Sequence, residues 1–239
     1  MVSLMIKIIP LIISLYFLIF TSVASAFELK PLYASLTPSG AGAEKVFRVS
    51  NTSDKPIAVQ FKTTTRKQHP DGTEEQSNAD DLFMIYPPQA VIPAHKTQKV
   101  RVQWLGEQNP KKELAYRFVA EQVPVKLSKR DSTEVQMVMT LVGSIYIEPQ
   151  GVNPQLDVSN IRQSGNKLIF TVRNTGTKHA MLENLTINLL GDGKQLELRG
   201  KQVFGAEGKN ILAGSYRDLS IPLPQGINPS TSWQAQLKF

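Results

Sequence analysis

The 239-residue sequence contains no cysteine and only three histidines, His69, His95 and His179. The lack of cysteine excludes disulfides, thiolate metal sites and a cysteine nucleophile. The histidines are too far apart in sequence to form a His-x-x-x-His pair. The formal charge is +7, but lysine and arginine are spread along the chain and form no basic patch of the kind that nucleic-acid-binding proteins carry. We therefore expect no nucleic-acid partner.

Motifs that would indicate catalysis are also missing. There is no DxDxDG loop and no GxSxG elbow. The glycine-rich stretches 191–194 (GDGK) and 205–209 (GAEGK) lack the following Ser or Thr of a phosphate-binding loop, so they are interpreted as hairpin turns. Asp80 and Asp81 could ligate a cation, but an adjacent surface pair of this kind is usually solvated. The sequence predicts no catalytic residue, metal or cofactor, which leaves a secreted hydrolase on a β scaffold as the weaker alternative.

The first 26 residues have the pattern of a secretory signal peptide. Lys7 is their only charged residue, the run Ile8 to Phe20 is apolar, and Ala24-Ser25-Ala26 is a small-x-small cleavage pattern. An uncleaved membrane anchor is the alternative, but the run is short for a span of about 20 residues and no basic cluster follows it. We expect cleavage before Phe27 and export from the cytosol.

The rest of the chain is dominated by strands with alternating polar and apolar residues. Between Lys99 and Trp104, one face carries Val100, Val102 and Trp104. Between Leu114 and Pro124, Tyr116 and Phe118 share one face, and Arg117, Val119 and Glu121 share the other. No long helical pattern is present, so the sequence predicts an all-β protein.

The strand pattern occurs twice, on either side of a short linker. The segment 47–52 (FRVSNT) and the segment 171–177 (TVRNTGT) each read as a strand that ends in an Asn-Thr turn. Between them, residues 149–154 (PQGVNP) have the composition of a linker. The prediction is a signal peptide over 1–26 and two tandem β-sandwiches over 27–148 and 155–239, joined by 149–154.

The strand before this linker is apolar on both faces. One row consists of Val135, Met137, Met139 and Leu141, and the other contains Val138 and Val142. A strand of this kind is buried on both faces. One row can cover the core of its own domain, and the second row then needs another partner. That partner could be the second domain or a different protein.

Five stretches together resemble the periplasmic pilus-assembly chaperones of the chaperone–usher pathway, the PapD-like family. They are FRVSNTSDKPIAVQF (47–61), FMIYPPQAVIPAHKTQKVRVQW (83–104), AYRFVAEQVPV (115–125), VQMVMTLVGSIYIEP (135–149) and, more loosely, TVRNTGTKHAMLENL (171–185). The EQVPV form and the lack of cysteine are similar to the archaic or alternative branches. The resemblance implies two immunoglobulin-like β-sandwiches in a boomerang arrangement.

The resemblance also implies a function without enzymatic chemistry. A chaperone of this family lends one strand to an incomplete pilin or fimbrial subunit in the periplasm and passes that subunit to an outer-membrane usher. By alignment, the donated row here is Val135, Met137, Met139 and Leu141, and methionine adapts well to irregular pockets. The free protein could self-associate through the same strand. The alternative is a secreted pilus subunit or adhesin, but a subunit should carry an N-terminal donor extension with alternating apolar residues, and residues 27–36 alternate only weakly.

The family's anchor for the C-terminal carboxylate of the subunit does not carry over. The resemblance implies an Arg on the first strand and a Lys late on the seventh, but Ser144 stands at the Lys position and residues 28–37 contain Lys30 and no Arg. A carboxylate in a partly dry site still needs a cation. Arg117 is the best substitute, because it lies on the strand expected beside the donor strand. Lys30 and Arg101 are the other candidates.

Two further positions bear on structure. Glu148 stands where the family's salt bridge between the domains would need a basic residue, so that bridge is not predicted. Tyr116, near the start of its strand, is interpreted as a tyrosine corner.

Overall fold

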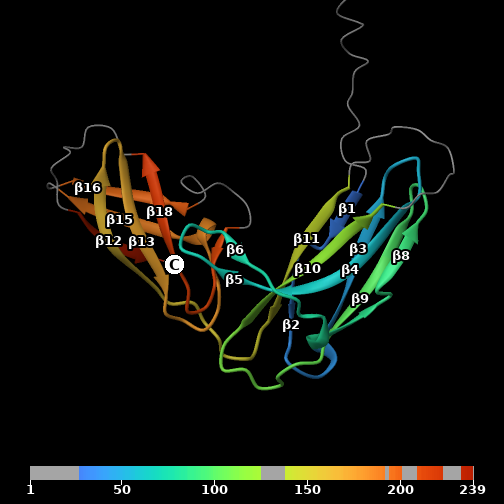
Figure 1. The fold of residues 1–239 in the computed structure, drawn as a ribbon. Helices are drawn as coiled ribbons and strands as arrows, with labels where there is room; N and C mark the ends of the chain where they lie inside the picture. Colours follow the sequence, from blue (N-terminus) through green and yellow to red (C-terminus); the bar gives the residue numbers. More distant parts are fainter. Residues whose placement is uncertain (1–26, 125–137, 192–193, 201–208, 223–232, 239) are drawn as a thin grey trace, which may run out of the picture.

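The structure is a computed structural model that describes residues 27–124, 138–191, 194–200, 209–222 and 233–238. Its described elements are strands and short 3₁₀ turns, arranged in two lobes that meet at an elbow (Figure 1). None of the described helical turns is long and apolar enough to cross a membrane. The prediction of an all-β chain with two sandwiches is confirmed.

The N-terminal lobe is a sandwich of two sheets. The first has the order β1-β3-β9-β7 and the second the order β2-β11-β10-β4-β8. The strands are β1 (Phe27–Lys30), β2 (Tyr33–Leu36), β3 (Glu44–Asn51), β4 (Ile57–Thr65), β7 (Phe83–Tyr86), β8 (Gln89–Ile92), β9 (Thr97–Trp104), β10 (Leu114–Val123) and β11 (Thr140–Ile147), with 3₁₀ turns η1 (Ala41–Ala43) and η2 (Asp80–Leu82). A hairpin of β5 (Lys67–Gln68) and β6 (Glu74–Glu75) leaves this lobe toward the other one.

Aromatic side chains fill the core between these two sheets. The fully buried Phe118 of β10 stacks on Phe47 of β3 at 4.5 Å between ring centroids, and on Phe61 of β4 at 6.0 Å. Tyr116 lies two residues earlier on the same face. Its ring centroid is 5.1 Å from that of Phe83 and 5.3 Å from that of Trp104. Burial raises the pKa of Tyr116. The alternation predicted for β10 is therefore confirmed, and Tyr116 belongs to an aromatic cluster.

The first two strands join the two sheets of this lobe. β1 pairs with β3 in the first sheet, whereas β2 pairs in parallel with β11 in the second sheet. Pro31 separates them, and because proline has no N–H to contribute to a ladder, the pairing changes there. The segment 27–36 thus contributes one strand to each sheet.

The C-terminal lobe is a smaller sandwich. Its sheets have the orders β12-β13-β18 and β16-β15-β19, and a short ladder pairs β14 with β17. The strands are β12 (Leu156–Ser164), β13 (Lys167–Asn174), β14 (Ala180–Met181), β15 (Thr186–Gly191), β16 (Lys194–Arg199), β17 (Asn210–Ile211), β18 (Tyr216–Pro222) and β19 (Gln234–Lys238), with the 3₁₀ turn η3 (Leu182–Asn184). Alternate residues of β13, namely Leu168, Phe170 and Val172, are fully buried in its core.

The repeated Asn-Thr turn has the same hydrogen bonds in both lobes. Asn51 and Asn174 are both buried at the end of a central strand. Each side-chain Nδ2 donates to the carbonyl four residues on, at 2.8 and 2.7 Å, and to a carbonyl of another strand at 3.0 and 3.1 Å. Each Oδ1 accepts the N–H two residues on, at 3.0 Å. Asparagine suits this turn because its amide can satisfy the backbone groups of the turn.

Candidate functional site

One edge of β11 is paired along only half of its length. On one side, β10 pairs with the whole strand, from Thr140 to Ile147. On the other side, β2 pairs with Ser144–Ile147 alone. Among the residues that the structure describes, no strand pairs with 140–143 on that side. An exposed strand edge of this kind can accept a strand from another chain.

Apolar side chains lie on both faces of the chain at this edge. Val138 and Val142 are 45% and 43% exposed. Met139 and Leu141 are half-buried and contact the core of the N-terminal lobe. The structure thus shows part of the predicted donor row against its own core, and the other row open to solvent. Val135 and Met137 lie outside the described residues.

Arg117 points toward this strand from β10. It lies directly across from Ser144 in the ladder, and its Nη1 donates to Ser144 Oγ at 2.6 Å. Its Nε and Nη2 donate to the two carboxylate oxygens of Glu74 at 2.8 and 2.7 Å. The side chain is 19% exposed. Arg117 therefore occupies a partly dry site beside β11, on the face that the alternation predicts.

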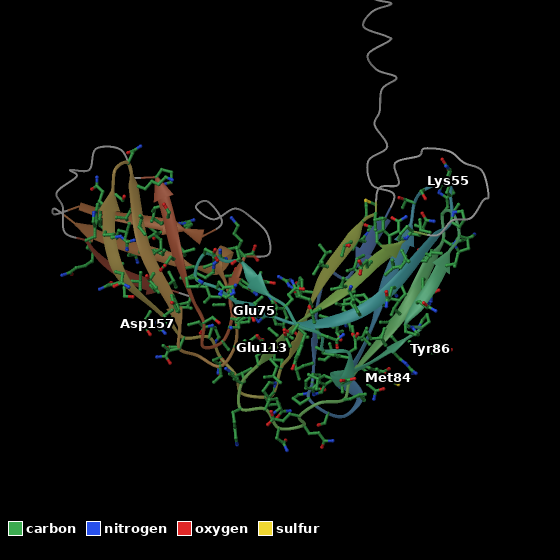
Figure 2. All side chains as sticks on the ribbon, in the orientation of Figure 1. Lys55, Glu75, Met84, Tyr86, Glu113 and Asp157 are labelled. Carbon is green, nitrogen blue, oxygen red and sulfur yellow. The ribbon has the colours of Figure 1, made fainter. Side chains whose placement is uncertain are left out.

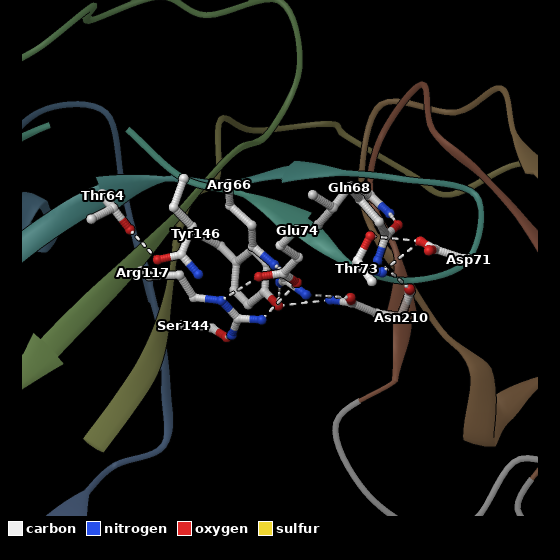
Figure 3. A network of polar contacts seen from close by, with 12 residues as sticks. Thr64, Arg66, Gln68, Asp71, Thr73, Glu74, Arg117, Ser144, Tyr146 and Asn210 are labelled. Atoms are coloured by element: carbon white, nitrogen blue, oxygen red, sulfur yellow. Dashed lines mark hydrogen bonds and ion pairs between the residues drawn. The ribbon is translucent and has the colours of Figure 1, made fainter. Parts of the chain in front are cut away.

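A second arginine binds the same carboxylate. Arg66, which follows β4 and is buried, donates through Nε to Glu74 at 2.6 Å. Its Nη1 donates to the hydroxyl of Tyr146 at 3.0 Å, and its Nη2 to Asn210 Oδ1 at 2.9 Å. Figure 3 shows these side chains converging from both lobes. The two guanidinium groups and Glu74 form one network that crosses the junction.

The hairpin β5–β6 extends this network into the C-terminal lobe. Gln68 exchanges hydrogen bonds with that lobe: its Nε2 donates to the carbonyl of Asn210 at 2.9 Å, and its Oε1 accepts the N–H of Leu212 at 3.1 Å. The N–H of Asp218 donates to the carbonyl of Pro70 at 2.8 Å. The hairpin thus ties the two lobes together through main-chain groups as well as side chains.

Arg66 and Glu74 were not singled out from the sequence, in which they lie in a polar stretch around the turn residues Pro70-Asp71-Gly72. The turn itself was a usable signal. A hairpin centred on it pairs Lys67 with Glu75 and Gln68 with Glu74, as the structure shows. Nothing in the local pattern, however, indicates that Arg66 is buried.

The other two anchor candidates lie elsewhere. Lys30 and Arg101 belong to β1 and β9, in the opposite sheet of the sandwich from Arg117. Lys30 is exposed and pairs with Glu28 at 2.6 Å, and Arg101 lies 4.0 Å from Glu44. The structure does not bring the three candidates together.

The carboxylate of Asp80 is engaged in local structure. Its Oδ1 accepts hydrogen bonds from the N–H of Thr63 at 2.6 Å and from the Thr63 hydroxyl at 3.1 Å, and Oδ2 accepts from Asn78 at 2.9 Å. In the described part of the chain, no group of three or more potential ligands could hold a metal ion.

A buried carboxylate at the elbow holds a histidine whose ring stacks on Tyr146. Glu113, labelled in Figure 2, is buried, and His179 Nδ1 lies 2.8 Å from both of its carboxylate oxygens. The His179 ring stacks on the Tyr146 ring at 4.1 Å between centroids. Tyr146 is thereby held between the His179 ring and the arginine network.

An ion pair between the lobes is present, which corrects the expectation at Glu148. The carboxylate of Glu148, next to the end of β11, accepts from Lys178 Nζ of the C-terminal lobe at 2.5 Å. The bridge thus exists with the acid on the N-terminal side. Burial would raise the pKa of Glu148, but the hydrogen bond and charge of Lys178, with help from Ser35 and His179, lower that pKa below its ordinary value.

This lowered pKa predicts an acid-dependent loss of stability. A carboxyl whose pKa is lower when folded stabilises the protein above its unfolded pKa of about 4.3, and the contribution disappears as the pH falls through the folded pKa. Glu148→Gln should therefore lower the free energy of unfolding at neutral pH by up to about 1 kcal/mol. Thermal unfolding at neutral pH and near pH 3 checks this. A difference between variant and wild type that stays the same at both pH values would contradict it.

Comparison with known proteins identifies the family of this chain. Residues 35–153 match the family model described as pili and flagellar-assembly chaperone, PapD N-terminal domain. The chain belongs to this family. A search of the curated proteins finds no match. The matched residues contain β11, Arg117 and the whole β5–β6 hairpin, so the chaperone's candidate site lies inside the part that carries the family's pattern.

Solved structures extend the match to both lobes. The class 5 fimbriae chaperone CfaA is 19% identical, with a TM-score of 0.56, and the alignment covers 89% of this chain and 99% of CfaA. A chain of the CsuC–CsuE chaperone–tip adhesion subunit complex, from archaic Csu pili of Acinetobacter baumannii, is 17% identical, with 82% and 90% coverage and a TM-score of 0.55. The E. coli chaperone DraB is 20% identical, with 87% coverage of both chains and a TM-score of 0.53. The predicted fold, two tandem immunoglobulin-like sandwiches, is confirmed for this chaperone.

Proposed function

We propose that the chaperone holds pilin or fimbrial subunits by donating the strand that leads into β11, and that it delivers them to an outer-membrane usher. The half-open edge of β11 carries this proposal, because the main-chain groups of 140–143 have no strand partner on one side among the described residues. A subunit strand that pairs there would extend the five-stranded sheet.

Apolar side chains supply most of the affinity in this proposal. We assign Val135, Met137, Met139 and Leu141 to the groove of the subunit, because Leu141 of β11 and Met139, which directly precedes that strand, share a row that contacts the core, and this row would continue from one sandwich into the other. Burying one such side chain is worth about 1.5–3 kcal/mol. Four of them contribute several kcal/mol before the cost of ordering the strand.

Arg117 is our candidate for the anchor of the subunit's C-terminal carboxylate. It lies across from Ser144, the position that aligns with the family's missing lysine, and it already binds a carboxylate in a partly dry site. A guanidinium holds a carboxylate with two parallel hydrogen bonds, which fixes the position and direction of the chain end. The anchor thus sets the register of the subunit strand along β11.

The remaining assignments follow from the same function. We assign 1–26 to a cleaved signal peptide, 27–148 and 155–239 to the two domains, 149–154 to the linker, and the mature protein to the periplasm. The chaperone needs no catalytic residue or cofactor, because subunit folding can drive release. The pilus-subunit alternative is not favoured, since the segment 27–36 is paired within both sheets and is not a free donor extension. Self-association through the β11 edge is a further proposal for the free protein.

Periplasmic co-expression with a pilin from the same genome tests the function. We expect a one-to-one complex on size exclusion with wild type, and a clear loss of complex with Arg117→Ala, because the chain end then lacks its cation. Arg48→Ala, on the outer face of β3, is the matched control and should bind like wild type. Normal subunit binding by Arg117→Ala would refute the anchor, and no complex with wild type would refute the chaperone assignment for that pilin.

A further inference from the structure

The carboxylate site at Arg117 is already filled by the chaperone itself. Both oxygens of Glu74 accept from Arg117, at 2.8 and 2.7 Å, and one of them also accepts from Arg66 at 2.6 Å. The Glu74 side chain is 13% exposed. A bidentate guanidinium together with a second guanidinium is an arrangement by which proteins bind a carboxylate ligand tightly.

The two arginines around Glu74 also have hydrogen-bond partners of their own. Arg66 keeps its hydrogen bonds to Tyr146 and Asn210, and Arg117 keeps its hydrogen bond to Ser144. The backbone of Glu74 is held in the two-residue strand β6, paired with Gln68 of β5. A rotation of the Glu74 side chain alone would therefore empty the site and leave both cations in place.

We propose that Glu74 is a built-in competitor for the subunit's C-terminal carboxylate. It fills the two-arginine site in the free chaperone and is displaced when a subunit binds. This inference rests on the proposed anchoring role of Arg117. Because the subunit's carboxylate replaces the carboxylate of Glu74, this exchange by itself contributes little free energy of binding. A small free carboxylate is therefore rejected, whereas a chain end that also pairs with β11 supplies the extra free energy.

The competitor thus couples two recognition events. Strand pairing along 140–143 and capture of the chain end must occur together before Glu74 is displaced. This requirement favours subunits whose C-terminal strand ends at the right distance along β11, and it works against unrelated acidic peptides. The ligand class that the site selects is a terminal carboxylate on an extended chain.

Two synthetic peptides with the C-terminal strand of a co-purifying pilin test this, one ending in a free carboxylate and one in an amide. Binding to the full mature chaperone is measured by calorimetry. We expect Glu74→Gln to bind the carboxylate peptide about tenfold more tightly than wild type, since the charged competitor is gone. The amide peptide should bind wild type and variant equally. Glu75→Gln, which removes the neighbouring exposed acid of the same strand, is the matched control and should behave like wild type.

Glu74→Asp provides a second variant that keeps the negative charge but shortens its reach, and we expect intermediate affinity from it. The proposal is overturned if Glu74→Gln binds the carboxylate peptide no more tightly than wild type, or more weakly, which would make Glu74 a positioning residue for Arg117. Loss of the preference for carboxylate over amide in every variant would refute the anchor as well. Failure of wild type to form a complex with any subunit would instead refute the proposed function.

Discussion

Met139→Asp is expected to abolish the one-to-one complex between the chaperone and a pilin subunit. Met139 directly precedes β11, and its main-chain carbonyl accepts from the N–H of Gln122 at 2.9 Å, which fixes the strand on the β10 side. In the proposed complex, its side chain enters an apolar groove, where an unpaired carboxylate costs several kcal/mol. Size exclusion after periplasmic co-expression measures the loss of complex.

Val138→Asp is the matched control for this substitution. Val138 is adjacent, belongs to the other row and is 45% exposed in the free protein. An aspartate there should reduce binding much less than Met139→Asp. Circular dichroism and thermal unfolding must show that both variants fold, because Met139 also contacts the core of its own lobe. If Val138→Asp loses the complex and Met139→Asp keeps it, the opposite row fills the groove. A complex that survives both variants would contradict strand donation at this edge.

Arg66→Ala is expected to lower the free energy of unfolding by about 3 kcal/mol. The Arg66 side chain is 3% exposed and hydrogen bonds to Glu74, Tyr146 and Asn210. Its removal leaves buried polar groups of both lobes without a partner, and such groups are costly in a dry environment. Urea unfolding measures the change.

Two further substitutions isolate the cause of this loss. Arg66→Lys should restore little of the stability, because an ammonium group cannot reach three partners in the directions that the guanidinium does. Arg48→Ala removes an exposed arginine from β3 and should change stability by no more than about 0.5 kcal/mol. An Arg66→Ala effect as small as that of Arg48→Ala would show that the network contributes nothing to the stability of the junction.

The parts of the fold that depend on local alternation were predictable. The rows Val100, Val102 and Trp104 on β9 and Tyr116 and Phe118 on β10 are buried as predicted, because a strand's period of two follows from backbone geometry alone. The two Asn-Thr turns were also visible in the sequence, since the asparagine amide determines the turn locally.

The candidate site was only half predictable for the same reason. The face of Arg117 and its place beside β11 follow from strand period and from the order of the strands. Its partner Glu74 is 43 residues away and reaches it through a hairpin that leaves the sandwich. The position of such a hairpin depends on contacts with the second lobe, and these contacts cannot be predicted from the local sequence pattern. The polarity of the Glu148–Lys178 pair was missed because it too is set across the junction.

The β5–β6 hairpin also changes what the linker has to do. The two lobes are held together by contacts such as Gln68 with Asn210 and Pro70 with Asp218, in addition to the chain that connects them through the proposed linker, residues 149–154. The linker also tethers the lobes, which gives the two contact surfaces a high effective concentration for each other. Under such a tether, individually weak hydrogen bonds are enough to keep the elbow closed. The end of the linker is itself held, because the carbonyl of Asn153 accepts from the N–H groups of Thr177 and Lys178 at 2.8 and 3.2 Å, so a change of length there would disturb the geometry that a subunit meets.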